Sequence, residues 1–509
     1  MSTSRSRTAI LAAVAAFLAM AAPSARPADV LLKNVIVYDG TGKRGFAGDV
    51  RIRGDRITEV GPHLAAKADD IVRDGQGLAL APGFIDMHSH ADDLILQDLD
   101  AENVTRQGVT TVVVGQDGAS IYPLADFLRK LENAHAALNV ASMVGHGTLR
   151  QHGMDQKNPL RASTPEELAK MKQLLAQELQ AGGFGLSSGL EYDPGHFATT
   201  EELIELSKLA GAAGGFYTSH VRDEGNGVFD SFREILQIGK GGHLPVEITH
   251  IKLATPSVWH ATPRVKEVFE QARKQGVNLQ ADVYPYTYWQ SNLRVIMLDR
   301  AYDNPEKVAI ALADNGGPDH IRFTLYPPDP SLVGKTLDEV AKAWNMTPVA
   351  AYSKAVRETS PPKEEAMITG ESMIEDDVRW FIAQPQTMFC SDGGLHDRHP
   401  RGAGSFPRIL GHYVRDEKLL PLEAAIHKMT ELPARQLGLK DRGQIAPGFV
   451  ADLVLFDPAT ILDGSVVGNS EAPPKGISEV MVSGTWVVEN GKVTSAHPGK
   501  VLRHTPKTP

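Results

Sequence analysis

Apolar and polar residues alternate along both ends of the chain, a pattern that predicts β-strands. Near the beginning, glycine-containing turns separate the strand-like segments 30–32, 35–37, 50–52 and 57–60. A matching series near the end comprises the segments 451–456, 479–482, 485–488 and 492–494. Because chain ends commonly lie close together in a domain, we predict one small β-sandwich built from residues 29–80 and 441–505.

The middle of the chain alternates between short apolar runs and amphipathic stretches, which predicts strands and helices in turn. The clearest helix start is 164–167 (TPEE), where a Thr cap precedes Pro and two acids. The strand candidates are 83–87, 110–115, 139–145, 184–188, 216–219, 245–249, 278–282 and 387–391. Eight strands joined by helices predict an α/β fold, a closed (β/α)8 TIM barrel formed by residues 81–288 and 376–440.

The seventh and eighth strand candidates are too far apart in the sequence for a single connecting helix. We therefore predict that residues 289–375 form an inserted subdomain before the last barrel strand. Within this segment, 326–330 (YPPDP) has the proline-rich composition of a loop.

The first residues have the pattern of a secretory signal peptide. Arg5 and Arg7 precede the apolar stretch Ala9–Ala22, and small residues follow as far as Ala28. This stretch is shorter than the roughly 20 residues that span a bilayer, which disfavours a membrane anchor. We predict a signal peptide over 1–28, secretion to a bacterial periplasm, and no membrane association after cleavage.

Charge and cysteine content exclude several classes of function. The chain has 52 basic and 62 acidic residues, a formal charge of −10, and no long run of Lys or Arg. A nucleic-acid partner is therefore not expected, because binding to phosphates requires a basic surface. Cys390 is the single cysteine, which excludes a disulfide framework and a metal site made of cysteines alone.

Histidine and aspartate residues gather at the predicted carboxyl ends of the barrel strands, where such barrels carry their chemistry. In chain order, these ends hold His88, His90, Asp117, His146, Ser188, His220, His250, Asp282 and Asp392. Residues i and i+2 of an extended chain face the same side, so His88 and His90 can reach one ion. One such histidine would more commonly be a buried structural residue, but His88, His90, His220 and His250 together predict a shared metal centre.

Asp392 follows the last strand candidate and has two possible roles. It could cap the turn that begins at Asp392-Gly393, since Asp-Gly is a common turn pair. In a zinc hydrolase it could instead bind metal weakly and carry a proton to the leaving nitrogen. Metal-bound hydroxide would then be the nucleophile, and zinc would polarise the amide carbonyl. We favour this catalytic role for Asp392.

Several motifs resemble those of a known group of enzymes. The segments 82–90 (PGFIDMHSH) and 443–454 (GQIAPGFVADLV) resemble signatures of the amidohydrolase superfamily. A narrower resemblance, to the D-aminoacylase (N-acyl-D-amino-acid deacylase) family, is carried by 145–150 (GHGTLR), 188–195 (SGLEYDPG), 282–286 (DVYPY), 396–401 (HDRHPR) and 405–408 (SFPR). The resemblance spans roughly residues 30–505.

The resemblance implies a barrel with a sandwich and metal-dependent release of the acyl group from N-acyl-D-amino acids. By motif matching, His220 and His250 would hold the tightly bound zinc, and the second or weaker position would be surrounded by His88, His90 and Asp392. The free carboxylate of the substrate would bind Lys252, Tyr284 and Arg401. Arginine can hold a carboxylate through two hydrogen bonds. A solvated Lys252 and an Arg401 paired to an acid are the alternatives.

One position departs from the family pattern. Where the family has a cysteine metal ligand after its second strand, this chain reads 115–118 (GQDG), so the matching residue is Asp117. The segment 184–189 has no lysine that could be carboxylated to supply an anionic ligand. A carboxylate can bridge two zinc ions, although it is a harder and weaker donor than a thiolate. We predict that Asp117 is a metal ligand rather than a turn cap.

These features predict a zinc-dependent amidohydrolase with one or two ions. The expected substrates are N-acyl-D-amino acids or small dipeptides, hydrolysed by metal-bound hydroxide with Asp392 as the proton shuttle. A hydrolase of cyclic amides or lactones remains an alternative, although Lys252 and Arg401 favour a substrate with a free carboxylate. A non-catalytic periplasmic protein that carries a metal or ligand is a third possibility, and a proton shuttle at Asp392 argues against it.

Overall fold

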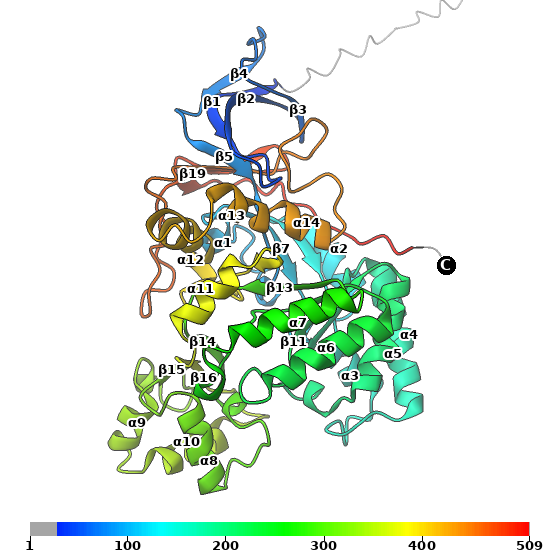
Figure 1. Cartoon of the computed structure of the whole chain (residues 1–509), viewed down its shortest axis with the longest axis vertical. Coiled ribbons are helices and arrows are strands. Elements are labelled where there is room, and N and C mark those ends of the chain that lie inside the picture. Colours follow the sequence, from blue (N-terminus) through cyan, green and yellow to red (C-terminus); the bar gives the residue numbers. More distant parts are fainter. Residues whose placement is uncertain (1–27, 508–509) are drawn as a thin grey trace, which may run out of the picture.

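The computed structural model describes residues 28–507 and has three parts (Figure 1). A sheet from both chain ends lies at the top of the view, the barrel lies in the middle, and the inserted subdomain lies at the lower left. Residues 1–27 of the predicted signal peptide lie outside the described residues. Within 28–507, no helix combines the length and the apolar character needed to cross a membrane.

Parallel strands form the barrel and confirm the predicted (β/α)8 fold. They are β6 (Phe84–Asp86), β7 (Val109–Val114), β8 (Asn139–Ser142) with its continuation β9 (Val144–Gly145), β10 (Gly185–Gly189), β11 (Phe216–His220), β12 (Val246–Ile248), β13 (Leu279–Val283) and β17 (Thr387–Phe389). The ring closes between its first and last strands, where Asp392 N donates to His88 O at 2.8 Å and His90 N donates to Gly393 O at 2.9 Å.

Burial on both faces explains why these strands have nearly continuous apolar sequences. Every residue of β7 (VTTVVV) is buried, as expected for a parallel strand covered by helices. The surrounding helices are α1 (Glu102–Thr105), α2 (Leu124–Ala134), α3 (His146–Gly153), α4 (Pro165–Ala181), α5 (Thr200–Ala212), α6 (Val228–Gly242), α7 (Thr262–Lys274), α11 (Glu375–Ala383), α12 (Arg401–Arg408), α13 (Leu422–Met429) and α14 (Glu431–Gln436). The helix predicted from 164–167 is α4, where Thr164 and Glu167 form a reciprocal capping box.

Both chain ends contribute to one sheet, as predicted for the sandwich. Within the described residues it has nine strands: β1 (Val30–Val37), β2 (Phe46–Arg53), β3 (Arg56–Gly61), β4 (Ile71–Asp74), β5 (Ala79–Pro82), β18 (Leu453–Phe456), β19 (Ile477–Val482), β20 (Thr485–Glu489) and β21 (Lys492–Val493). Antiparallel pairing of β5 with β18 joins the two ends. The final segment, predicted to belong to the sandwich as far as residue 505, runs along the amino ends of the barrel strands. There Leu502 N donates to Val140 O at 2.8 Å and His504 N donates to Gly182 O at 2.9 Å.

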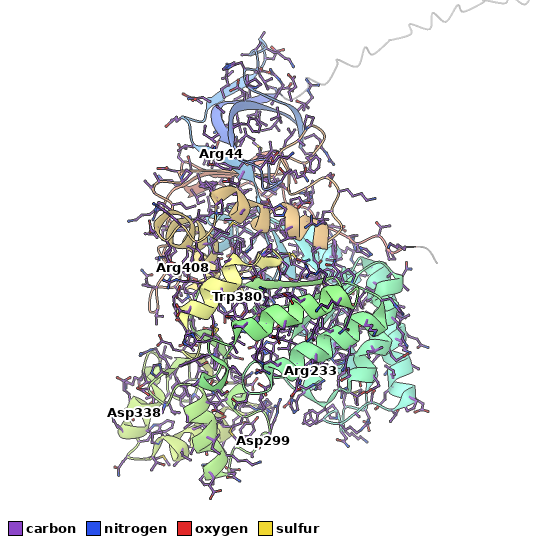
Figure 2. All side chains as sticks on the ribbon, in the orientation of Figure 1. Arg44, Arg233, Asp299, Asp338, Trp380 and Arg408 are labelled. Carbon is purple, nitrogen blue, oxygen red and sulfur yellow. The ribbon has the colours of Figure 1, made fainter. Side chains whose placement is uncertain are left out.

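The inserted subdomain has its own core and stands at the carboxyl end of the barrel. Its antiparallel strands are β14 (Trp289–Asn292), β15 (Ile321–Leu325) and β16 (Met367–Gly370), and its helices are α8 (Pro305–Asp314), α9 (Leu337–Ala343) and α10 (Pro348–Thr359). Figure 2 shows it as the yellow-green lobe that carries Asp299 and Asp338. Gln290 Nε2 donates to Asp397 Oδ1 at 2.6 Å, and Arg398 Nη1 donates to Thr324 O at 2.6 Å. These contacts place the subdomain beside the loop that follows the last barrel strand.

Candidate metal centre

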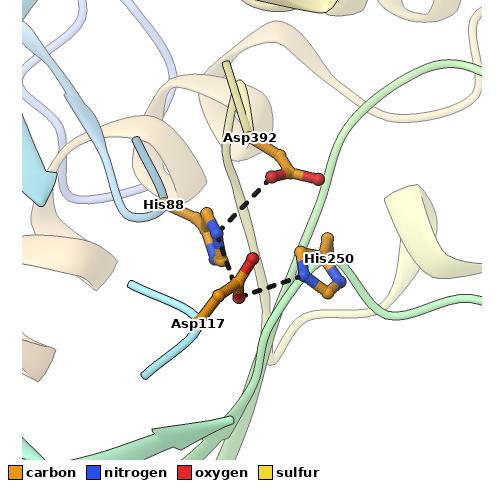
Figure 3. Close-up of side chains that lie close together, drawn as sticks. All are labelled: His88, Asp117, His250 and Asp392. Atoms are coloured by element: carbon orange, nitrogen blue, oxygen red, sulfur yellow. Dashed lines mark ion pairs between the residues drawn. The ribbon is translucent and has the colours of Figure 1, made fainter. Parts of the chain in front are cut away.

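The structure brings all the predicted metal ligands together at the carboxyl ends of the barrel strands. His220 is the last residue of β11, and the other five lie in the loops directly after their strands: His88 and His90 after β6, Asp117 after β7, His250 after β12 and Asp392 after β17. Four of them, His88, Asp117, His250 and Asp392, place one ligand atom each within 4.8 Å of one another (Figure 3).

Asp117 lies at the centre of this group. Its Oδ1 is 3.4 Å from His88 Nε2, 3.5 Å from His250 Nε2 and 3.9 Å from His220 Nδ1. Its Oδ2 is 3.6 Å from His90 Nε2. One carboxylate therefore faces nitrogen atoms of all four predicted histidine ligands.

The nitrogen and oxygen atoms of these side chains are arranged better for binding a cation than for hydrogen bonding with one another. His220 Nδ1 is 3.1 Å from His250 Nε2, and His88 Nε2 is 3.3 Å from His90 Nε2. Asp117 Oδ1 is buried and accepts no hydrogen bond from the described residues. Imidazole nitrogens and carboxylate oxygens are ligands that zinc accepts. The residues present therefore fit one or two zinc ions.

Three of these residues have left-handed backbone conformations, which non-glycine residues seldom adopt. The φ angles are 53° at Asp117, 34° at His250 and 51° at Asp392. Gly118, with φ 75°, follows Asp117, and a Cβ there would lie 2.8 Å from Gly189 N. The glycine thus allows the loop to pack against β10 while the carboxylate points toward the histidines. Strained backbone of this kind concentrates at functional sites.

The two cations predicted to bind substrate are each paired with an acid. Lys252 Nζ lies 2.7 Å and 2.8 Å from the two carboxylate oxygens of Glu224. Arg401 Nη1 donates to Asp392 Oδ2 at 2.5 Å. Burial alone would raise the pKa of Asp392, but Arg401 and His250 bring that pKa well below its usual range. The alternative of an Arg401 paired to an acid is thus what the structure contains.

Tyr284, the third predicted substrate residue, lies beside both cations. Its ring centre is 5.0 Å from Arg401 Cζ and 5.7 Å from Lys252 Nζ. Its hydroxyl is buried and has no hydrogen-bond partner among the described residues. Lys252, Tyr284 and Arg401 therefore form one group, in which two positive charges lie near the Tyr284 ring.

Two acids that were not predicted from the sequence contact the predicted ligands. Glu191 Oε2 is 3.2 Å from His220 Nε2, and Glu224 Oε1 is 3.0 Å from His250 Nδ1. A carboxylate on the second ring nitrogen orients a metal-binding histidine and raises its basicity. Glu191 lies within the quoted motif 188–195, and Glu224 is four residues after His220. These two positions in the sequence could have identified Glu191 and Glu224 as residues of the site.

Other polar residues at the strand ends have structural partners instead. His146 Nε2 lies 2.8 Å from Glu202 Oε1, in a buried network with Arg150. Asp282 Oδ1 accepts from the His250 backbone N at 2.6 Å. Asp282 therefore holds the backbone of the His250 loop through this hydrogen bond.

A cavity of about 930 Å³ opens from this centre. The barrel contributes His90, Asp117, His220, His250, Lys252, Asp392 and Arg401 to its wall. The inserted subdomain contributes the opposite wall, which includes Gln290, Val295, Leu298, Ile310 and Met367. This volume is near the upper end of the roughly 300–1,000 Å³ found for small-molecule sites.

Comparison with known proteins shows similarity to amidohydrolases over most of the chain. The amidohydrolase family matches residues 72–488. D-aminoacylase from Alcaligenes xylosoxydans xylosoxydans is 36% identical, over 96% of this chain and 100% of the relative. N-acyl-D-glutamate deacylase from the same organism is 35% identical, over 93% of this chain and 96% of the relative.

Solved structures extend the similarity to three dimensions. N-acyl-D-glutamate deacylase from Bordetella bronchiseptica, complexed with zinc and a phosphonate mimic of the tetrahedral intermediate, matches with a TM-score of 0.84 and 33% identity, covering 94% of this chain and 99% of that one. A crystal structure of D-aminoacylase matches with a TM-score of 0.83 and 35% identity, covering 94% and 100%. With this barrel, this cluster of histidines and acids and this extent of similarity, the chain belongs to the amidohydrolase family.

Proposed function

We propose that the protein is a zinc-dependent hydrolase of the amide bond in N-acyl-D-amino acids or related small dipeptides. The observation that carries this proposal is the convergence of four histidines on Asp117, with Asp392 facing two of them and two cations alongside. The related D-aminoacylase and N-acyl-D-glutamate deacylase support the substrate class.

Zinc would be held by two adjacent sets of ligands. Asp117, His220 and His250 would hold one ion, and His88, His90 and Asp392 would surround a second or weaker position. When bound, zinc supplies a Lewis acid for the amide carbonyl and activates water for attack.

Asp392 is placed to move a proton. Its Oδ2 is held by Arg401, while its Oδ1 faces His90 Nε2 at 3.3 Å and His88 Nε2 at 3.5 Å. Oδ1 would accept the proton of the attacking water and return it to the leaving amine nitrogen. Fixing Oδ2 leaves a single oxygen for both transfers, which keeps the shuttle in one orientation.

The substrate carboxylate would bind at the group formed by Lys252, Tyr284 and Arg401. The Tyr284 hydroxyl could donate to it directly, because that hydroxyl has no partner among the described residues. Arg401 would keep Asp392 and share its remaining N–H groups with the substrate, whereas Lys252, whose Nζ contacts both Glu224 oxygens and His250 Nδ1, would contribute its charge. A cyclic amide or lactone, which has no free carboxylate, would make no use of this group.

The test is a stereodefined library of N-acyl amino acids and dipeptides, assayed with zinc and with a chelator. We expect turnover of D-compounds with a free carboxylate, loss with chelator, and recovery with zinc. Faster turnover of neutral cyclic amides or lactones would favour the alternative chemistry. A zinc-loaded protein inert across the library would refute the proposal and favour a carrier.

We also propose that the protein is exported to a periplasm. The support is the sequence of the first residues, with Arg5 and Arg7 before an apolar stretch and small residues near Ala28. Expression of the full chain followed by fractionation and N-terminal mass spectrometry tests this. An intact N-terminus in the cytoplasmic fraction would contradict it.

A further inference from the structure

Two arginines of the inserted subdomain meet one aspartate of the barrel. Asp193 lies in the loop after β10, and its Oδ2 accepts from Arg294 Nη2 at 2.8 Å. Its Oδ1 accepts from Arg300 Nη2 at 2.9 Å and from Arg300 Nε at 3.2 Å. Each of these side chains is about one-fifth exposed, so the contacts are largely shielded from water.

Arg300 makes a contact with the barrel that Arg294 does not. Its Nη2 also donates to the backbone carbonyl of Glu191 at 2.6 Å. One planar guanidinium therefore spans the loop from residue 191 to residue 193, a use of the rigid donor fork that lysine cannot reproduce.

Arg300 binds the backbone carbonyl of Glu191, and the side-chain carboxylate of the same residue faces the metal centre. Its Oε1 accepts from Glu224 N at 2.9 Å, and its Oε2 is 3.2 Å from His220 Nε2. The other ring nitrogen of His220, Nδ1, faces His250 and Asp117. Glu191 thus lies beside the ring nitrogen of His220 that faces away from His250 and Asp117.

We propose that Arg300 is a positioning residue for the metal centre, acting through Glu191 on His220. The inserted subdomain then forms part of the metal-binding structure as well as a wall of the substrate cavity. The alternative is that Arg300 only anchors the subdomain to the barrel. Arg294 provides a matched control, since it binds the same carboxylate at similar exposure without touching Glu191.

The test measures zinc affinity of the full-length holoenzyme by competition with a chromophoric chelator, together with the melting temperature. Replacing a carboxylate behind a metal-binding histidine commonly costs about 10–100-fold in metal affinity, which we expect for Glu191→Gln. For Arg300→Gln, one contact further away, we expect weakening by about tenfold, near the lower end of that range. For Arg294→Gln we expect an affinity close to that of the wild type.

Equal zinc affinities of Arg300→Gln and Arg294→Gln would overturn the proposal. This holds if both variants bind zinc like the wild type, and also if both bind zinc more weakly and melt at a lower temperature. Arg300→Lys keeps the charge and the pairing with Asp193, and it serves as the test variant if Arg300→Gln does not fold. We expect Arg300→Lys to bind zinc more weakly than the wild type, and wild-type affinity in that variant would also overturn the proposal. The inference rests on the metal centre of the proposed function. Because zinc binding is measured without substrate, an enzyme inactive on every acyl amino acid would leave it standing.

Discussion

Replacing Asp117 by Asn tests the residue on which the metal centre depends most. Asparagine keeps the size of the side chain and tolerates the left-handed φ of 53° at this position, so the main change is the loss of one negative charge. That charge faces His88, His250 and His220 nitrogens at 3.4–3.9 Å. Removing one partner from a buried charged contact costs about 3–5 kcal/mol. At about 1.4 kcal/mol per factor of ten, zinc should bind roughly 10²–10⁴-fold more weakly.

The assay is zinc content by mass spectrometry after dialysis, with the dissociation constant from chelator competition. Melting temperatures with and without zinc provide a second readout, because a tightly bound ligand stabilises only the folded chain. Asp93→Asn is the matched control, since Asp93 is an exposed acid of the same cavity with no ion pair among residues 28–507. Wild-type zinc content and affinity in Asp117→Asn would refute the assignment of Asp117 as a ligand.

Three further substitutions separate catalysis from stability. Asp392→Asn should retain the zinc held by Asp117, His220 and His250 but lower kcat by about 10²–10⁴, the usual value of a general acid–base, and near-normal turnover with bound metal would exclude the proton shuttle. Lys252→Met leaves Glu224 buried without its cation and should destabilise the fold by about 3 kcal/mol in urea unfolding. Lys172→Met, at a partly exposed ion pair with Glu205, should cost less than about 1 kcal/mol. Lys428→Met should cost about 1–3 kcal/mol, because the buried Lys428 amino group donates to carbonyls at the end of α11 that would lose their partner. An unchanged free energy of unfolding would contradict this.

The barrel and the positions of its ligands could be predicted because both follow from local patterns. Buried parallel strands such as β7 are apolar on both faces and therefore stand out in the sequence. Once a strand is identified, its last residue marks the carboxyl end of the barrel. His220 and His250 could be placed in one site by this rule, although 30 residues separate them.

The ion pairs could not be predicted, since they depend on loop conformation rather than on strand order. Lys252 and Glu224 lie in loops after different strands and are 28 residues apart. The left-handed φ angles of Asp117 and Asp392 decide where these carboxylates point, and only the adjacent glycines hinted at such turns. The contact of Arg300 with Asp193 spans 107 residues and joins two separately folded parts of the chain.

The charges of the centre explain why its cations and its metal depend on each other. Asp117, Glu191, Glu224 and Asp392 bring four carboxylates into a largely buried region, while Lys252 and Arg401 supply two positive charges. With the histidines neutral, as metal binding requires, the four carboxylates and two cations leave two negative charges uncompensated. One zinc ion balances them, which avoids the large cost of buried unpaired charge. A substrate carboxylate would then add a negative charge to a balanced centre. Its binding is therefore favoured by a second ion, or by hydrogen bonds such as the one that the free Tyr284 hydroxyl can donate.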